Sequence, residues 1–254
     1  MNSRKKISVV IATYNGEKYI EQQIKSNLLQ LSIDDEIIIS DDNSKDNTIG
    51  IVSCIGDTRI KVIQNRKSIG LIKNFQVGLK LVEGDYVFLS DQDDIWQENK
   101  VKIFLEYLKD YDVVQSDATI VDSNLQVLYP SLYALKGSRR GLIRNLWKNN
   151  YVGCNMAFKR KVLDVALPFP RHIPMHDIWI GFVTELFFSS FFIPEKLLLY
   201  RRHFDNFTQT GSKSPFSLMQ KFKFRLNTVR YVPIILFRYL SVSLRFSRLS
   251  KISA

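Results

Sequence analysis

Short runs of apolar residues alternate with longer segments of helical periodicity along the first half of the chain. Five runs have the length of buried strands: Ile7–Ala12, Glu36–Ser40, Arg59–Ile63, Tyr86–Leu89 and Asp112–Gln115. Four segments between and after them carry apolar residues every three or four positions and predict helices: Glu17–Leu31, Lys45–Cys54, Gly70–Val82 and Glu98–Leu108. Ser44 precedes the second helix, so we expect it to be the N-cap. This alternation predicts an α/β fold, with a mostly parallel central sheet and helices on both faces.

The second half of the chain has a less regular pattern. Apolar runs predict strands at Gly153–Phe158 and Phe191–Tyr200, and a helix is expected to begin near Asp177. From Pro215 onward the pattern is helical, with a break expected at Pro233 because proline interrupts helical hydrogen bonding. We therefore divide the chain into a first half at 1–116, a second half at 117–212 and a tail at 213–254.

Positive charge is concentrated in this tail. The chain of 254 residues has a formal net charge of +11, and residues 213–254 hold nine Lys or Arg and no Asp or Glu. Phe and Leu residues lie between these cations, a pattern typical of a segment on an anionic membrane surface. Nucleic acid is the competing partner for a basic chain, but the charge surrounds no nucleic-acid-binding motif, so we favour the membrane.

Hydropathy and cysteine usage indicate a cytosolic protein. No window reaches the roughly 20 apolar residues of a membrane span, and Ile7–Ala12 is shorter than the apolar core of a secretory signal. Cys54 and Cys154 match no metal-ligand spacing. We expect both to be reduced, partly buried thiols.

Polar side chains follow three of the predicted strands. They are Thr13-Tyr14-Asn15, Asp41-Asp42-Asn43 and Asp91-Gln92-Asp93-Asp94. Ligands of parallel sheets bind beyond the carboxyl ends of the strands, so these segments are expected to meet at one rim. The Asp91 and Asp93 pair suits Mg²⁺ or Mn²⁺, which prefer oxygen ligands. For Asp46 and Asp94 we favour the simpler interpretation, that they are helix caps or solvated turn residues.

Phosphate recognition has to come from elsewhere in the chain. Neither common glycine-rich phosphate loop is present in the sequence. We therefore expect a diphosphate to be held by the metal together with nearby cations, such as Lys73 or Arg66.

Taken together, these motifs resemble the inverting family 2 glycosyltransferases with the GT-A fold. The resemblance rests on TYNG after the first strand, on IIISDDNSKDNT, and on GDYVFLSDQDDIW, and it covers roughly residues 7–110. The form SDQDDIW, with the preceding IGLIKNF, is similar to bacterial enzymes that build rhamnose-containing surface polysaccharides. In this interpretation residues 1–116 bind the nucleotide and 117–212 bind the acceptor.

The resemblance implies a role for each side chain at the rim. Thr13, Tyr14 and Asn15 would line the nucleotide, and Asp42 would accept a hydrogen bond from the base. For Asp41, a structural role and a direct contact with the nucleotide are equally consistent with the sequence. Asp93 would be the main ligand of a Mn²⁺ or Mg²⁺ cofactor, and Asp91 would assist through the sugar, the ribose or a water. His203 is a further candidate metal ligand. The equally supported alternative is that His203 is a surface residue without such a role.

The resemblance also places a catalytic base in the second half. Asp177 of PMHDIW stands where the family has the acid that deprotonates the acceptor hydroxyl, and it is also expected to cap the helix that follows. Family members more often carry Glu where this chain has His176. Gly153, Asn155, His176 and Arg202 would belong to the wall around donor and acceptor. Arg201 and Arg202 are expected to help hold the diphosphate, and residues 206–214 to close over the donor.

The function expected from these features is metal-dependent transfer of a sugar, from dTDP-rhamnose or a UDP-hexose, to a saccharide that is lipid-linked. The enzyme would work in bacterial cell-surface polysaccharide synthesis, at the inner face of the cell membrane. Two alternatives remain at this stage. A sugar nucleotidyltransferase would carry a glycine-rich loop after the first strand, where this chain has TYNGEKY. A non-catalytic nucleotide-sugar or glycan-binding module would not need Asp177.

Overall fold

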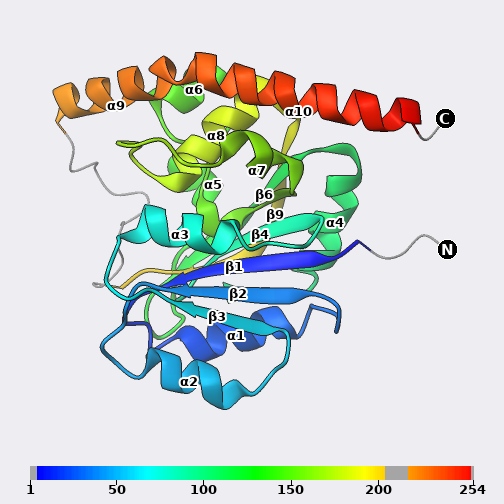
Figure 1. Ribbon diagram of the computed structural model, residues 1–254. Helices are drawn as coiled ribbons and strands as arrows, with labels where there is room; N and C mark the ends of the chain where they lie inside the picture. Colours follow the sequence, from blue (N-terminus) through cyan, green and yellow to red (C-terminus); the bar gives the residue numbers. More distant parts are fainter. Residues whose placement is uncertain (1–4, 204–216, 253–254) are drawn as a thin grey trace.

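The computed structural model describes residues 5–203 and 217–252, with α-helices packed around one twisted sheet (Figure 1). The strands are β1 Ile7–Thr13, β2 Glu36–Asp41, β3 Ile60–Gln64, β4 Tyr86–Asp91, β5 Ile95–Trp96, β6 Val113–Val121, β7 Val127–Tyr129, β8 Met156–Lys159 and β9 Ser190–Arg201. The helices are α1 Ile20–Leu28, α2 Thr48–Ile55, α3 Leu71–Leu79, α4 Lys100–Asp110, α5 Leu132–Lys136, α6 Leu142–Trp147, α7 Lys161–Ala166, α8 His176–Phe187, α9 Leu218–Arg230 and α10 Val232–Ile252. None of the described helices combines the length and apolarity needed to cross a bilayer.

The central sheet has the strand order β3-β2-β1-β4-β8-β6-β9-β5, with β7 paired to β6. The first four strands are parallel to one another, and β9 is parallel to β6. The short strands β5, β7 and β8 are antiparallel to their neighbours. The predicted mostly parallel α/β sheet is confirmed, and each antiparallel pair includes a strand from the second half, β7, β8 or β9, where the sequence pattern is least regular.

Helices cover both faces of this sheet, as predicted, because strand residues alternate between two hydrophobic clusters. In β1, Val9 and Ile11 belong to the cluster that includes Ile20 of α1. Val10 and Ala12, from the same strand, belong to the cluster that includes Phe75 of α3 and residues of α7 and α8. Burial on both faces explains why the strand runs in the sequence are apolar throughout.

The start of α2 differs from the prediction. The helix begins at Thr48 with Asn47 as its N-cap residue, so the expected Ser44 cap is wrong. The Ser44 hydroxyl instead donates to Asp41 Oδ1 at 2.5 Å and accepts from the Asn15 amide at 2.9 Å. Asp46 does act near the helix start, since its carboxylate accepts from the Thr48 amide at 3.0 Å. Two loops that follow strands thus hold each other through short polar side chains.

The structure tests the expected burial of the two cysteines and the expected helical tail. Cys154 is buried, but Cys54 is exposed on α2, so the expected partial burial of Cys54 is wrong. In the tail, α9 and α10 are separated at Tyr231, two residues before Pro233. Helix α10 packs on the core through Ile235, which is fully buried.

Candidate functional site

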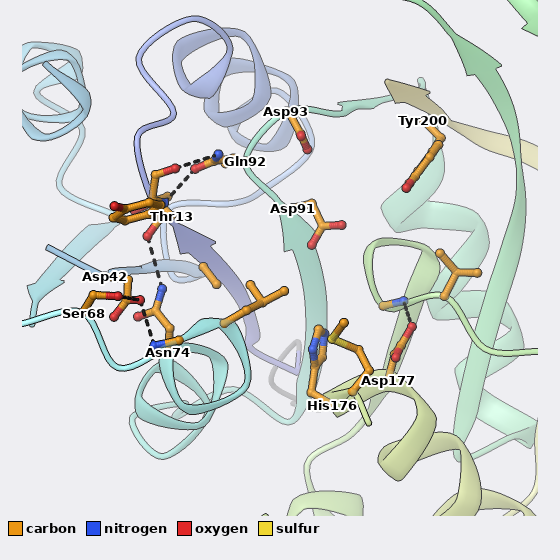
Figure 2. A pocket seen from close by; sticks show the side chains of 17 residues that line it. Thr13, Asp42, Ser68, Asn74, Asp91, Gln92, Asp93, His176, Asp177 and Tyr200 are labelled. Carbon is orange, nitrogen blue, oxygen red and sulfur yellow. Dashed lines mark hydrogen bonds between the residues drawn. The ribbon is translucent and has the colours of Figure 1, made fainter. Parts of the chain in front are cut away.

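The candidate site is a cavity of about 440 Å³ beyond the carboxyl ends of β1, β2 and β4 (Figure 2). Its wall includes Thr13, Tyr14, Asp42, Asp91, Asp93, Gly153, His176 and Asp177, all of which the sequence identifies as site residues. The register explains the convergence: Thr13 pairs with Asp41 across β1 and β2, and Ala12 pairs with Asp91 across β1 and β4. The three strands therefore end at one level and present their next residues to the same space.

One end of the cavity is organised around the Asp42 carboxylate. It accepts hydrogen bonds from the Ser68 hydroxyl at 2.7 Å and from the amides of Ile69 at 2.7 Å and Gly70 at 2.9 Å. Gly70 has φ of 85°, a left-handed conformation that suits glycine, and it directly precedes α3. Asp42 is thereby fixed in position, and because Oδ2 accepts two of these bonds and Oδ1 only one, Oδ1 retains room for a further donor.

Thr13 and Tyr14 form the neighbouring wall. The Thr13 hydroxyl donates to Asp41 at 3.0 Å, and Asn74 of α3 donates to the Thr13 carbonyl at 3.2 Å. Tyr14 lines the cavity and is half exposed as a residue. The Gln92 side chain accepts from the Tyr14 amide at 2.9 Å and donates to the Tyr14 carbonyl at 3.2 Å, which fixes the backbone. An open tyrosine ring on a fixed backbone provides a surface on which a planar base can stack.

The centre of the cavity is acidic. Asp91 and Asp93 point into it from the end of β4, and Tyr200 of β9 faces them (Figure 2). Burial, together with the negative charges of Asp93 and then Asp177, raises the pKa of Asp91 to about 7. His203 reaches Asp93 from the other half of the chain, with Nε2 2.9 Å from Oδ2. These side chains form a cluster with excess negative charge.

Behind this group lies a buried polar layer. Burial, followed by the charges of Asp93 and Asp91, raises the pKa of Asp94 well above its usual range, so its expected role as a cap or solvated turn residue is wrong. Burial likewise raises the pKa of the Cys154 thiol and lowers that of the Lys100 ammonium to about 8. Lys100 Nζ donates to the Cys154 carbonyl at 3.1 Å and is the cation of this layer that offsets the carboxylates.

The first turn of α8 forms the opposite wall. Asp177 Oδ2 accepts from the Gly153 amide at 3.3 Å, and Oδ1 accepts from the Ile178 amide at 2.7 Å. The N-cap residue of α8 is Met175, so Asp177 lies inside the first turn and the cap prediction is wrong. A Cβ atom added to Gly153 would lie 2.8 Å from His176 Nε2, so the close packing of this wall requires glycine.

Several predicted residues lie outside the cavity wall. Asn15 closes the contact between two loops, where its side-chain oxygen accepts from the Lys45 amide at 2.8 Å. Lys73 and Arg66 are exposed, and Asn155 is fully buried. The Arg202 guanidinium lies over the Tyr129 ring, with Cζ 5.3 Å from its centroid. Residues 206–214, the expected closing segment, lie outside the described residues.

Arg201 has a different role from the predicted one. It is buried, and its guanidinium donates to the carbonyls of Asp93 at 2.8 Å and Ser123 at 2.9 Å. Its backbone amide donates to Asp94 Oδ1 at 2.9 Å. The expectation that Arg201 holds diphosphate is therefore replaced by a structural one: it fixes the backbone that carries the acidic residues.

Four residues with polar side chains line the cavity without a role predicted from the sequence: Ser68, Asn74, Gln92 and Tyr200. Ser68 and Asn74 hold the Asp42 and Thr13 segments, and Gln92 holds Tyr14. Gln92 lies inside the quoted SDQDD motif, so its position was visible, but nothing local indicated its partner 78 residues away.

The donor set fits a hard divalent cation. Carboxylate oxygens from Asp91 and Asp93 with one imidazole suit Mn²⁺ or Mg²⁺. The raised pKa of Asp91 indicates negative charge that the protein itself leaves uncompensated at this point. Among the described residues, Asp91, Asp94 and Cys154 have ligand atoms within 4.8 Å of one another, but a thiolate is a soft ligand that suits metals other than Mn²⁺ and Mg²⁺.

Comparison with known proteins agrees with the geometry. Residues 8–166 match the family model described as glycosyl transferase family 2. The chain is 31% identical over 244 residues to the dTDP-rhamnosyl transferase RfbG of Shigella flexneri, covering 87% of this chain and 79% of that protein. It is 25% identical to the β-1,3-glucosyltransferase WfgD of Escherichia coli, whose name specifies UDP-Glc and a GlcNAc-diphosphoundecaprenol, covering 70% of each protein. S. aureus TarS in complex with UDP-GlcNAc has the same fold, with a TM-score of 0.68 at 19% identity, covering 96% of this chain and 74% of that one.

Proposed function

Because this chain belongs to glycosyl transferase family 2 and has the GT-A fold, we propose that it is a metal-dependent inverting transferase of bacterial cell-surface polysaccharide synthesis. It would move a sugar from dTDP-rhamnose or a UDP-hexose to a lipid-linked saccharide. One observation carries the proposal: Asp42, Asp93 and Asp177 come from three distant segments and line one cavity. A binding module would not need the third of these residues.

The nucleotide fits the end of the cavity formed by Asp42, Thr13 and Tyr14. The ring N–H of uracil or thymine is a donor, and the Asp42 carboxylate is a fixed acceptor with capacity remaining. The Tyr14 ring is the stacking partner. Asn15 supports this wall through the loop contact rather than by lining it.

The diphosphate belongs at the acidic centre. Asp93, Asp91 and His203 would hold Mn²⁺ or Mg²⁺, which when bound supplies the positive charge that stabilises the departing nucleoside diphosphate. Asp93 keeps its position through Arg201, which binds its carbonyl, and through His203, which meets its carboxylate. Lys73 and Arg202 would contribute to donor binding from outside the cavity wall, since neither side chain lines the cavity.

Asp177 is the proposed catalytic base. Inversion requires the acceptor hydroxyl to attack the anomeric carbon on the face opposite the leaving group, while a carboxylate removes its proton. The Gly153 and Ile178 amides fix the Asp177 carboxylate at the wall facing Asp91. His176 and Gly153 would then lie against the donor sugar, and the buried Asn155 would support the wall behind them.

The donor sugar and acceptor are proposed from the relatives. RfbG is named as a dTDP-rhamnosyl transferase, which favours dTDP-rhamnose. WfgD is named for a diphosphoundecaprenol-linked saccharide, which favours a lipid-linked acceptor and UDP-glucose as the next donor. Such an acceptor would bring the enzyme to the inner face of the membrane, where the basic tail at 213–254 would contact anionic lipid.

The decisive experiment is a ligand panel followed by product analysis. Purified protein is heated with dTDP-rhamnose, UDP-glucose, UDP-GlcNAc and GDP-mannose, each with Mn²⁺, Mg²⁺ or chelator. The true donor at about 100 times its Kd should stabilise the fold by about 2.7 kcal/mol, and only with the metal. Transfer with inverted anomeric configuration then establishes the reaction. Stabilisation without turnover on any saccharide acceptor would favour the binding module.

A further inference from the structure

Helix α10 is apolar on two opposite sides. Ile235, Tyr239 and Val242 pack against the core, where Tyr239 stacks on Phe187 at 4.6 Å between ring centroids. The other side leaves Phe237, Leu240 and Leu244 largely exposed. Packing within the described chain accounts for the first side only, and an exposed row of large apolar residues of this kind is typical of an interaction surface.

Helix α9 has an exposed apolar row of its own. Met219, Phe222, Leu226 and Val229 follow helical spacing along one side of α9, and all four are exposed. Figure 1 shows α9 and α10 lying end to end across one edge of the molecule, on the side away from α1 and α2.

Helix α6, about 80 residues earlier in the chain, adds to this surface. Ile143 is 83% exposed and Trp147 is 76% exposed. Arg225 of α9 ties the two helices together, since its guanidinium donates to the carbonyls of Leu146 and Trp147, both at 2.9 Å. The same guanidinium lies over the Trp147 ring, with Cζ 4.6 Å from the ring centroid. Trp147 thus borders the exposed row of α9.

The two segments also share their charge. Residues 123–150, which include α6, contain five Lys or Arg and no Asp or Glu, just as the tail has nine and none. Arg139, Arg140, Arg144 and Lys148 are exposed, whereas Lys136 is partly buried, so four of the five contribute to the surface. A surface that combines exposed apolar side chains with positive charge is complementary to the interface of a bilayer that contains anionic lipid.

We propose that α6, α9 and α10 form one docking surface for an anionic phospholipid bilayer, in which Ile143 and Trp147 enter the headgroup region beside the tail. This inference rests on the proposed function for its purpose, which is to bring the cavity to a lipid-linked acceptor. A second copy of the chain is disfavoured as occupant, because two such faces would oppose cations with cations. Nucleic acid would leave the exposed Ile143, Phe222 and Phe237 without partners.

Trp147 is its own reporter for this contact. The other two tryptophans, Trp96 and Trp179, are buried in the core. When full-length protein is added to vesicles of phosphatidylcholine with about 30% phosphatidylglycerol, which have a negative surface potential, the emission of Trp147 should shift to shorter wavelength and be protected from aqueous quencher. The W147F variant should lose this signal and stay bound. Vesicle binding without any change at Trp147 would overturn the proposal.

Variants complete the test. I143S/W147S should weaken partition onto these vesicles about tenfold, as expected from two apolar anchors. L29S/I33S is the matched control, because Leu29 and Ile33 are 86% and 76% exposed at the far end of the molecule, and it should bind as the parent does. Unchanged partition of I143S/W147S, equal binding to pure phosphatidylcholine, or conversion from dimer to monomer by I143S/W147S would each overturn the proposal. Donor stabilisation, measured in the same variants, should not change, so a failure of the glycosyltransferase assignment would be seen separately.

Discussion

His203 and Asp93 are 110 residues apart in the chain, yet Nε2 of the histidine lies 2.9 Å from Oδ2 of the aspartate. The contact joins the segment after β9 to the segment after β4. Arg201 reinforces it from two residues away by donating to the Asp93 carbonyl at 2.8 Å. The second half of the chain therefore both supports and completes the acidic centre that the first half begins.

Asp93→Ala should abolish metal-stimulated turnover, and His203→Ala should weaken the apparent affinity for Mn²⁺ by about 10- to 100-fold, since each removes a group of the proposed metal site. Titration of turnover and of thermal stability with Mn²⁺ measures both effects. His172→Asn, at an exposed position with left-handed φ, is the matched control and should titrate like the parent. Parent activity that persists in chelator would contradict the metal assignment.

Asp91→Asn should stabilise the metal-free protein at alkaline pH. The folded pKa of Asp91 is about 7, above the value of about 3.9 for an unfolded aspartate. Between these pH values the folded state binds more protons at this position, so the free energy of unfolding falls as pH rises and the loss is complete above about 7. Denaturant unfolding in chelator should show a gain for Asp91→Asn that is about 2–3 kcal/mol larger at pH 8 than at pH 5. Asp110→Asn, an exposed control, should show no such difference.

The sequence predicts the strands and the rim because both follow from local pattern. Strands buried on two faces read as continuous apolar runs, and parallel order brings Asp42 and Asp91 to one edge. The partners of the rim residues follow from tertiary packing instead. The sequence around Asp94 predicts a helix cap or a solvated turn residue. In the structure Asp94 is buried, and the backbone amide of Arg201, 107 residues later, donates to its carboxylate. Ser44 is likewise predicted to be a cap, but its hydroxyl donates to Asp41 and accepts from the Asn15 amide.

Asp177→Asn should reduce transfer by about 10²–10⁴-fold while leaving donor affinity close to that of the parent, because the carboxamide keeps the shape of the side chain and an oxygen for one of the two backbone amides, but it takes no proton. Steady-state rates and donor titration of the same preparation separate the two quantities. Loss of donor binding in step with activity would show instead that Asp177 only organises the wall.

Ser68→Ala should weaken nucleotide affinity several-fold, and Asp42→Ala should weaken it more. The serine supplies one of three donors to the Asp42 carboxylate, whereas the aspartate is the proposed contact to the base. Calorimetric titration with the nucleoside diphosphate alone is the measurement. If acceptor KM rises more than donor Kd in Asp42→Ala, the assignment of this end of the cavity to the base is wrong.

His176 provides the sharpest test of the sugar end of the cavity. Its ring is buried in the cavity wall and stacks on Phe75 with 3.9 Å between ring centroids, yet neither ring nitrogen has a hydrogen-bond partner among the described residues. Burial lowers its pKa, so near pH 7 the imidazole is neutral, with one donor and one acceptor. That pair is complementary to a sugar hydroxyl, and a buried polar group without a partner costs about 1–3 kcal/mol until one arrives.

His176→Phe keeps the stacked ring and removes both polar atoms, so kcat/KM should fall about 10- to 100-fold. His176→Gln keeps a donor and an acceptor and should lose less. The nucleoside diphosphate without sugar should bind both variants as it binds the parent, because the base end and the acidic centre are intact. If the affinity for the nucleoside diphosphate alone falls as much as that for the full donor, His176 contacts the phosphates and not the sugar. If the acceptor KM rises while donor affinity is unchanged, His176 contacts the acceptor. Only loss confined to the sugar-bearing donor supports the assignment, since a general disturbance of the wall beside Asp177 would affect every ligand together.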